Sequence, residues 1–278
     1  MRTSKKERNM DKQRILFIGA GRMAEAIFSG LLKEKAEFIE TIILSNQSDV
    51  TRLEKMQAAY NVAITTDWKT VISDVDIIVL ACPPKAHAAV LDDMSPYIKG
   101  QFIVTVAAGI GLAILEDKLP TGTPVAWVMP NTSADVGESM SIYCYGQAVS
   151  DYERRLLEMM LDGIGAYEEC TEQQIHSLTA ITGSAPAFFY KFCEALEEEA
   201  ITYGISREKA RTLVAQMVYG SAAMVKAGND PVNLREQVTS PGGATAAGLE
   251  VLEQKGYANI IQEAVKATNA RALAQGKN

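Results

Sequence analysis

The chain has 278 residues, of which 47% are hydrophobic and 22% charged, so it is long and apolar enough to fold into one large or two moderate domains. Its formal net charge is −7, which provides no overall positive field to recruit nucleic acid, and no apolar run approaches the roughly 20 residues that span a bilayer. The four cysteines show no CxxC spacing and the two histidines lie far apart, which argues against a metal site. We therefore expect the cysteines to be reduced thiols of a cytoplasmic protein.

The first half of the chain predicts strands that alternate with helices. Residues 1–12 carry charges without an apolar segment behind them, and we expect a disordered extension there. Short apolar runs follow, with helix-like segments between the earlier ones, at residues 15–18, 41–45, 76–82, 101–109 and 124–130. Runs that are apolar on both faces are typical of a parallel sheet covered by helices, so we expect an α/β domain over residues 13–150.

The second half, residues 151–278, predicts a helical domain, because its apolar residues recur three and four positions apart. Ser206 is placed to cap a helix that Gly228 closes. Pro186 lies in a stretch of small residues, 182–187, and is expected to kink or restart its helix. That stretch suits either a close helix crossing or the wall of a ligand pocket.

The sequence GAGRMA at residues 19–24 follows the first apolar run and opens a helix, which is the setting of a dinucleotide-binding loop. Gly19 permits the tight turn, Gly21 lets the backbone approach a pyrophosphate, and Ala24 lets the helix pack close to the sheet. The free N–H groups at the start of the helix would then face the phosphates.

The end of the second apolar run, residues 45–48, reads Ser-Asn-Gln-Ser and carries no carboxylate. A carboxylate at this point normally accepts a hydrogen bond from the ribose of NAD and repels the 2′-phosphate of NADP. Its absence favours NADPH over NADH, with Arg52 as a candidate cation to neutralise the phosphate.

A second glycine-rich loop, VTSPGGAT, occupies residues 238–245, where Ser240 is a natural helix N-cap. Gly242 and Gly243 would weaken a first helical turn by roughly 1 kcal/mol each relative to alanine, which indicates that something approaches the backbone closely. Backbone N–H groups together with the hydroxyls of Ser240 and Thr245 suit a carboxylate. Because the first loop accounts for the cofactor phosphates, we expect the second loop to hold the substrate.

Five stretches of this sequence, in their order and spacing, resemble the pyrroline-5-carboxylate reductases, the enzymes of the last step of proline synthesis. They are residues 17–27, 107–110, 128–132, 182–187 and 238–253. The resemblance implies an N-terminal Rossmann domain and a C-terminal all-helical dimerisation domain, in a homodimer that often assembles further. The implied reaction is hydride transfer from NAD(P)H to the C=N carbon of a small-molecule substrate, 1-pyrroline-5-carboxylate.

The resemblance also implies which residues form the site. The substrate carboxylate would be held by Ser240, Gly242, Gly243, Ala244 and Thr245, and Thr245 would act as the catalytic residue by placing a hydroxyl near the imine nitrogen. The cofactor would contact Gly19, Ala20, Gly21, Arg22, Met23, Ser45, Asn46, Gln47, Ala81, Cys82, Pro83, Pro84, Ala107, Ala108 and Gly109. Neither His87 nor His176 lies in a matched stretch, and we expect both at the surface or an interface.

The chain departs from the family's usual residues at several positions. Trp68 stands where asparagine is usual, Pro83 where lysine is usual, and Trp127 where arginine is usual, and Gln47 also differs. These departures fall around the expected cofactor face, and they leave open a catalytically weakened, nucleotide-binding paralogue with a regulatory role. A reductase of another carboxylated imine, or of a hydroxy acid, is a further alternative, because the second loop is intact.

Overall fold

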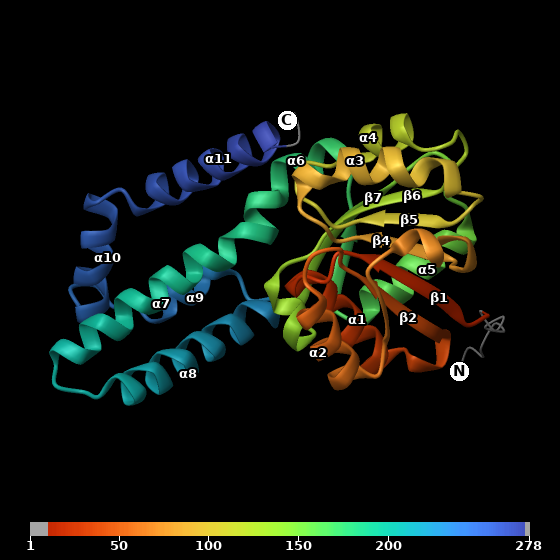
Figure 1. The fold of residues 1–278 in the computed structure, drawn as a ribbon. Coiled ribbons are helices and arrows are strands. Elements are labelled where there is room, and N and C mark those ends of the chain that lie inside the picture. Colours follow the sequence, from red (N-terminus) through yellow and green to blue (C-terminus); the bar gives the residue numbers. More distant parts are fainter. Residues whose placement is uncertain (1–10, 276–278) are drawn as a thin grey trace, which may run out of the picture. The chain divides into compact units, whose positions relative to one another are not determined.

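The computed structural model describes residues 11–275, which form two compact units (Figure 1). The first unit comprises residues 11–183 together with 269–275, and the second comprises residues 184–268. The expected disordered extension, residues 1–12, lies almost wholly outside the described residues. Within residues 11–275, no helix is both long enough and apolar enough to cross a membrane.

An eight-stranded sheet forms the centre of the first unit, in the order β3-β2-β1-β4-β5-β6-β7-β8. The strands are β1 Gln13–Ile18, β2 Ile39–Ser45, β3 Ala63–Thr65, β4 Ile77–Leu80, β5 Phe102–Thr105, β6 Val125–Met129, β7 Ser139–Tyr145 and β8 Gly165–Glu169. Neighbouring strands run parallel, except that β6 and β7 are antiparallel. This mostly parallel sheet confirms the expected Rossmann-type α/β architecture.

Helices cover both faces of the sheet: α1 Arg22–Glu34, α2 Val50–Tyr60, α3 Pro84–Met94, α4 Leu112–Lys118 and α5 Asp151–Asp162 (Figure 1). Alternate residues of β1 serve the two faces. Ile15 and Phe17 belong to the cluster formed with α1, α2 and α5, whereas Leu16 and Ile18 belong to the cluster formed with α3 and α4. Burial on both faces is the reason that the central strands are continuous apolar runs in the sequence.

The apolar runs predict five of the eight strands and miss β3, β7 and β8. The strand β3 has only three residues, and β8 carries Glu168 and Glu169 at the edge of the sheet. The strand β7 is buried but contains Ser139 and Ser141, whose hydroxyls lie 3.2 Å apart and so satisfy each other. Short, edge and polar strands therefore escaped the hydrophobic pattern.

The compact units divide later in the chain than residue 151, where helical spacing begins. The helix α5 belongs to the first unit because Leu156, Leu157 and Met160 are buried in the core under the sheet. The next segment pairs with β7 as β8, so the expectation of helix throughout residues 151–278 is wrong at this strand. The helix α6, Glu172–Thr179, completes the first unit.

The second unit is helical, as expected. Its helices are α7 Ala185–Thr202, α8 Arg207–Lys226, α9 Pro231–Gln237, α10 Ala244–Gln254 and most of α11 Tyr257–Gln275. Ser206 caps α8 by accepting a hydrogen bond from the Lys209 N–H, and Gly228, with φ of 89°, follows its end. Pro186 stands in the first turn of α7, just after a π-helical turn at Ala180–Ser184, which confirms the expected restart. Among the described residues of this unit, only Ala210 and Val214 are buried.

Candidate functional site

The first glycine loop connects β1 to α1, and its two glycines are required for different reasons. Gly19 has φ of 106°, and a Cβ atom there would lie 2.6 Å from backbone atoms of Ala81 and Cys82, so only glycine fits. Gly21 has an ordinary backbone conformation, and a Cβ atom there would meet no protein atom within 4 Å. The space in front of Gly21 is therefore open to a ligand, while Ala24 is fully buried as the loop motif predicts.

The start of α1 adds the electrostatic part of an anion site. Gly21 is the N-cap of this helix and makes no side-chain capping bond, so the first N–H groups of the helix remain available. The helix dipole makes this end partly positive. The exposed Arg22 side chain lies beside it and pairs with Asp135 at 3.0 Å. The arrangement can bind a pyrophosphate, as predicted for residues 19–23.

A cavity of about 580 Å³, which we call the loop cavity, lies at the carboxyl ends of β1, β4 and β5. It is lined by the first glycine loop, by the segments that follow β4 and β5, and by residues between the end of β2 and the start of α2: Gly19, Ala20, Gly21, Arg22, Met23, Asn46, Asp49, Arg52, Ala81, Cys82, Pro83, Pro84, Val106, Ala107 and Ala108. The structure thus brings together three groups of predicted cofactor residues, although Gly109 does not line the cavity. The strand order reverses between β1 and β4, which is the usual ligand position in such sheets.

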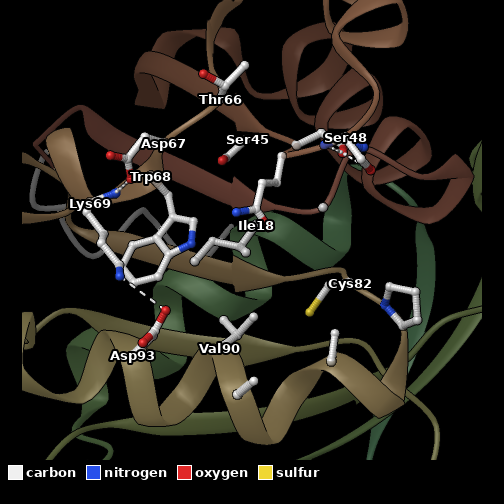
Figure 2. A pocket seen from close by; sticks show the side chains of 16 residues that line it. Ile18, Ser45, Ser48, Thr66, Asp67, Trp68, Lys69, Cys82, Val90 and Asp93 are labelled. Carbon is white, nitrogen blue, oxygen red and sulfur yellow. Dashed lines mark hydrogen bonds and ion pairs between the residues drawn. The ribbon is translucent and has the colours of Figure 1, made fainter.

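A second cavity of about 810 Å³, the tip cavity, adjoins the loop cavity and shares Gly19, Asn46, Cys82 and Pro83 with it. Its lining contains the predicted tip of β2, together with side chains from the segment after β3 and from α3 (Figure 2): Ser45, Asn46, Gln47, Ser48, Thr66, Asp67, Trp68, Lys69, Ala86, Ala89, Val90 and Asp93. The two adjoining cavities together suit an elongated, two-part ligand such as a dinucleotide.

The charged groups of the tip cavity were not predicted from the sequence. Lys69 forms an ion pair with Asp93 at 3.1 Å, and its ammonium lies 5.4 Å from the centre of the Trp68 ring (Figure 2). The hydrogen bond to Asp93 raises the pKa of Lys69. The Asp67 carboxylate accepts a hydrogen bond from the Lys69 backbone N–H at 3.0 Å. Asp67, Trp68 and Lys69 follow β3, which is too short to produce a pattern, and Asp93 lies in α3. Of these four residues the sequence singled out only Trp68, as a departure near the expected cofactor face.

Arg52, the candidate cation for a 2′-phosphate, lines the loop cavity rather than the tip cavity, and its charge is already paired. Its guanidinium forms an ion pair with Glu25 at 2.9 Å and donates to the Ala20 carbonyl. Glu25 in turn accepts a hydrogen bond from the Tyr60 hydroxyl at 3.0 Å. Arg52 therefore holds the first glycine loop through the Ala20 carbonyl, with its charge balanced by Glu25. Among the described residues that line the tip cavity, Lys69 is the one cation.

The two histidines do not both lie at a surface or an interface as expected. His87 is fully buried on the inner side of α3, where it contacts Thr105 at the end of β5. His176 is partly exposed, and its ring centre lies 4.8 Å from that of the buried Trp127. Burial lowers the pKa of His87, so this side chain is neutral at pH 7.

The second glycine loop lies in the helical unit, and its helix begins later than the sequence predicts. The helix α10 starts at Ala244 with Gly243 as its N-cap, so Ser240 does not cap it. The Ser240 carbonyl instead accepts the Gly243 N–H at 3.0 Å, closing a turn in which Gly242 has φ of 69°. A Cβ atom at Gly243 would overlap the Ser240 hydroxyl. The positive φ explains Gly242 by the turn that precedes the helix, whereas Gly243 has an ordinary backbone conformation.

The predicted substrate residues nevertheless stay together at this turn and helix start. The N–H groups of Ala244, Thr245 and Ala246 have no partner inside α10, because a helix leaves its first N–H groups unpaired. The side chains of Ser240 and Thr245 are exposed beside them. Free N–H groups with two hydroxyls can bind a carboxylate. Elsewhere, residues 11–275 contain no group of three or more His, Cys, Asp or Glu side chains arranged to hold a metal ion.

Comparison with known proteins identifies the family. Residues 172–274 match a family model for pyrroline-5-carboxylate reductase dimerisation, and residues 14–109 match one for coenzyme F420-dependent NADP oxidoreductases. The pyrroline-5-carboxylate reductase 1 of Bacillus spizizenii is 34% identical over 96% of this chain and 92% of its own length. The chain belongs to the pyrroline-5-carboxylate reductase family.

Two further members of the family cover nearly the whole chain. The pyrroline-5-carboxylate reductase of Methanosarcina acetivorans is 33% identical over 96% of this chain and 100% of its own. The crystal structure of Plasmodium falciparum pyrroline carboxylate reductase with NADP bound has 29% identity and a TM-score of 0.87, covering 96% of this chain and 100% of that one. The resemblance expected from the five motifs is thus confirmed, as is the fold.

Proposed function

We propose that this protein reduces 1-pyrroline-5-carboxylate to proline with NADPH as the hydride donor, the last step of proline biosynthesis. The observation that carries the proposal is the 34% identity over 96% of the chain to a protein named pyrroline-5-carboxylate reductase. The start of α1 and the start of α10 supply two anion sites, one for cofactor phosphates and one for a substrate carboxylate. The relatives described above are all reductases, so they give the weakened-paralogue alternative no support.

The activity is tested with purified protein, pyrroline-5-carboxylate and NADPH, by following the loss of reduced-cofactor absorbance. We expect turnover in the ordinary enzymatic range, about 1 to 1,000 per second. Cofactor binding without turnover would contradict the proposed function and would favour the regulatory paralogue. Faster turnover of a different carboxylated imine would replace the substrate but keep the reaction type.

The residues of the first unit fit a dinucleotide. The open space at Gly21 and the uncapped start of α1 would hold the pyrophosphate, with Arg22 at its rim. The segments 81–84 and 106–109 would form the walls around the remainder of the cofactor. When bound, NADPH supplies the hydride for the C=N carbon. The protein then has to position the two reactants and exclude water, which accounts for much of the rate enhancement in such reactions.

The choice of NADPH over NADH is a finer part of the proposal. It is supported by the absence of a carboxylate at residues 45–48, and by the Lys69 ammonium in a cavity that Ser48 and Thr66 also line. Exchanging Lys69 for methionine should weaken NADPH binding and leave NADH binding unchanged, because only NADPH carries a 2′-phosphate. Exchanging Asp93 for asparagine should strengthen NADPH binding, because Asp93 competes for the ammonium. Equal effects on both cofactors would contradict this assignment.

For the substrate, we propose that Ser240, Gly242, Gly243, Ala244 and Thr245 bind the carboxylate and that the Thr245 hydroxyl lies near the imine nitrogen. The matched variants are Thr245→Ala, which removes the hydroxyl, and Thr245→Ser, which keeps it. Loss of one hydrogen bond to a charged group is worth about 1.5–3 kcal/mol, so kcat/KM should fall at least tenfold in the alanine variant. The serine variant should stay near the wild type. Unchanged kinetics in Thr245→Ala would remove this role.

Self-association is supported by the second unit. Among its described residues 184–268, only Ala210 and Val214 are buried, while large apolar side chains such as Phe189, Leu213 and Tyr219 are exposed. A helical unit cannot be stable with so little core, so we propose that its apolar faces pack against a second copy in a homodimer. The match to a dimerisation model over residues 172–274 supports this. Sedimentation should show a dimer whose melting temperature falls on dilution, and a monomer with constant melting temperature would contradict the proposal.

The proposed location is a reducing compartment such as the cytoplasm. The four cysteines are free thiols, with Cys144 buried and Cys82, Cys170 and Cys193 partly buried. Proteins of oxidising compartments commonly convert such thiols to disulfides. Thiol titration of the denatured, unreduced protein should therefore find four thiols per chain, and a lower count would contradict this location.

A further inference from the structure

His87 is a buried polar side chain that the proposed reaction does not use. It lies in the first turn of α3 and is fully buried, between the segment that follows β4 and the end of β5. Its Nε2 atom lies 3.0 Å from the Thr105 hydroxyl, and its Nδ1 atom lies 3.2 Å from the Pro83 carbonyl oxygen. The Cys82 sulfur is 3.5 Å from Nδ1. A ring with both nitrogens engaged joins two separate segments of the backbone.

The neighbours of the ring determine its tautomer. A carbonyl oxygen can only accept, so Nδ1 must carry the proton and donate to Pro83. The Nε2 atom is then an acceptor, and the Thr105 hydroxyl donates to it. The Thr105 oxygen is left free to accept from the Ala107 N–H, which lies 3.3 Å away. Every polar atom in this series of hydrogen bonds has a partner only when His87 is neutral, which agrees with the lowered pKa of His87.

The chain of hydrogen bonds continues to the other side of the same segment. The Ala107 carbonyl accepts a hydrogen bond from the Trp127 indole N–H at 3.0 Å, and Trp127 is fully buried in β6. Ala107 is thus held at its N–H through Thr105 and at its carbonyl by Trp127. The segment after β4 is held against Gly19, where no Cβ atom would fit. The three lining segments of the loop cavity are therefore connected through buried contacts.

We propose that His87, acting through Thr105, is a positioning residue that sets the spacing between the segments 81–84 and 106–109 around the cofactor. The backbone ladder between β4 and β5 reaches the hydrogen bond from the Val106 N–H to the Leu80 carbonyl at 3.2 Å, and beyond it the buried His87 bridge holds the two segments at their separation. The inference rests on the proposed function for the identity of the ligand as a nicotinamide dinucleotide. It goes beyond that function because it gives a role to His87, which is not one of the proposed cofactor-binding residues but contacts two of them, Cys82 and Pro83.

The test measures the Kd of NADPH without substrate, by titration of protein fluorescence, together with KM values for both reactants. His87→Leu and Thr105→Val each remove the bridge and should raise the Kd of NADPH three- to tenfold, the range expected when one buried hydrogen bond is broken. Thr105→Ser keeps the hydroxyl and should stay within twofold. The double variant should bind NADPH no more weakly than the weaker-binding single variant, because both substitutions remove the same hydrogen bond. The KM for pyrroline-5-carboxylate should not change.

The matched control is Thr123→Val, which removes another buried threonine hydroxyl, one that donates to Pro120 before β6. It should lower the melting temperature without changing the Kd of NADPH. Three results would each overturn the proposal. The Kd of NADPH could be unchanged in Thr105→Val, it could be raised in Thr105→Ser as well, or the effects of the two single variants on it could multiply in the double variant. If His87→Leu does not fold, the Thr105 series decides alone. Since cofactor binding is measured without substrate, a failed reductase assay leaves this test intact.

Discussion

Replacing Gly21 with alanine should separate cofactor binding from folding. The backbone at Gly21 has φ of −76° and ψ of −179°, and an added Cβ atom would meet no protein atom within 4 Å. The change therefore stabilises the fold by about 0.4–1 kcal/mol, because alanine lowers the conformational entropy of the unfolded chain. Against this, alanine is a poorer N-cap than glycine, which costs about 0.5–1 kcal/mol. The two effects offset each other, so the melting temperature should move by no more than about 2 °C.

The same Cβ atom would occupy the space through which a pyrophosphate approaches the start of α1. Loss of one charge-assisted hydrogen bond is worth about 2 kcal/mol, which corresponds to a rise in the Kd of NADPH of about 30-fold. Calorimetric titration with NADPH measures this change, and thermal unfolding without cofactor measures the stability.

Gly19→Ala is the matched variant with the opposite expectation. At φ of 106° and 2.6 Å from the backbone of Ala81, its Cβ atom adds strain of about 1–2 kcal/mol and overpacking of about 1–3 kcal/mol. The melting temperature should then fall by roughly 10 °C. If Gly21→Ala keeps its affinity for NADPH, or loses as much stability as Gly19→Ala, the reasoning about the first glycine loop is wrong.

Three further outcomes follow from buried groups. The pKa of His87 is lowered below 6.5 in the folded protein, so as the pH falls His87 is protonated in the unfolded chain before it is protonated in the folded one. The free energy of unfolding should therefore fall as the pH drops below 6.5, by at most about 1.4 kcal/mol per pH unit. Urea unfolding should show this slope in the wild type but not in His87→Gln, and parallel curves would contradict it. Burial raises the pKa of Cys82 to about 11 and that of Cys144 to about 12. Compared with an ordinary thiol at pH 8, Cys82 should have about 100-fold less thiolate, but each thiolate should be about tenfold more nucleophilic. Alkylation of Cys82, followed by mass spectrometry, should therefore be about tenfold slower than that of an ordinary thiol, and an ordinary rate would refute the burial argument. Trp127→Phe removes the indole donor and leaves the Ala107 carbonyl with the longer 3.4 Å hydrogen bond from the Ile110 N–H, so it should cost about 0.5–1.5 kcal/mol in urea unfolding, and full stability would contradict a contribution from the indole.

The first glycine loop could be predicted from the sequence because its physical requirements are local. A strand, a turn that needs positive φ at Gly19, and an open backbone at Gly21 all lie within a few consecutive residues. The apolar runs likewise predicted the five strands that are buried on both faces, because burial imposes a continuous pattern. The same reasoning failed for β3, β7 and β8, which are short, polar or at the sheet edge.

The start of α10 shows how a local rule can mislead. Ser240 followed by proline is a favourable helix start, yet the chain makes a turn first and the helix begins at Ala244. Gly242 and Gly243 serve that turn, through a positive φ at one and the nearby Ser240 hydroxyl at the other. The predicted residues stay together, and the turn gives Gly242 a reason that the sequence did not indicate.

By itself the sequence determined the dinucleotide loop, the positions of the five buried strands along the chain and the family resemblance, since each depends on residues close together in the chain or on motifs in a set order. Only the tertiary structure decided that Lys69 and Asp93 line one cavity with the tip of β2, that Glu25 pairs with Arg52, and that His87 is buried against Thr105. These contacts join residues between about 18 and 48 positions apart whose separations follow no period. They arise because parallel strands bring the ends of distant segments to one edge of the sheet, where the site lies.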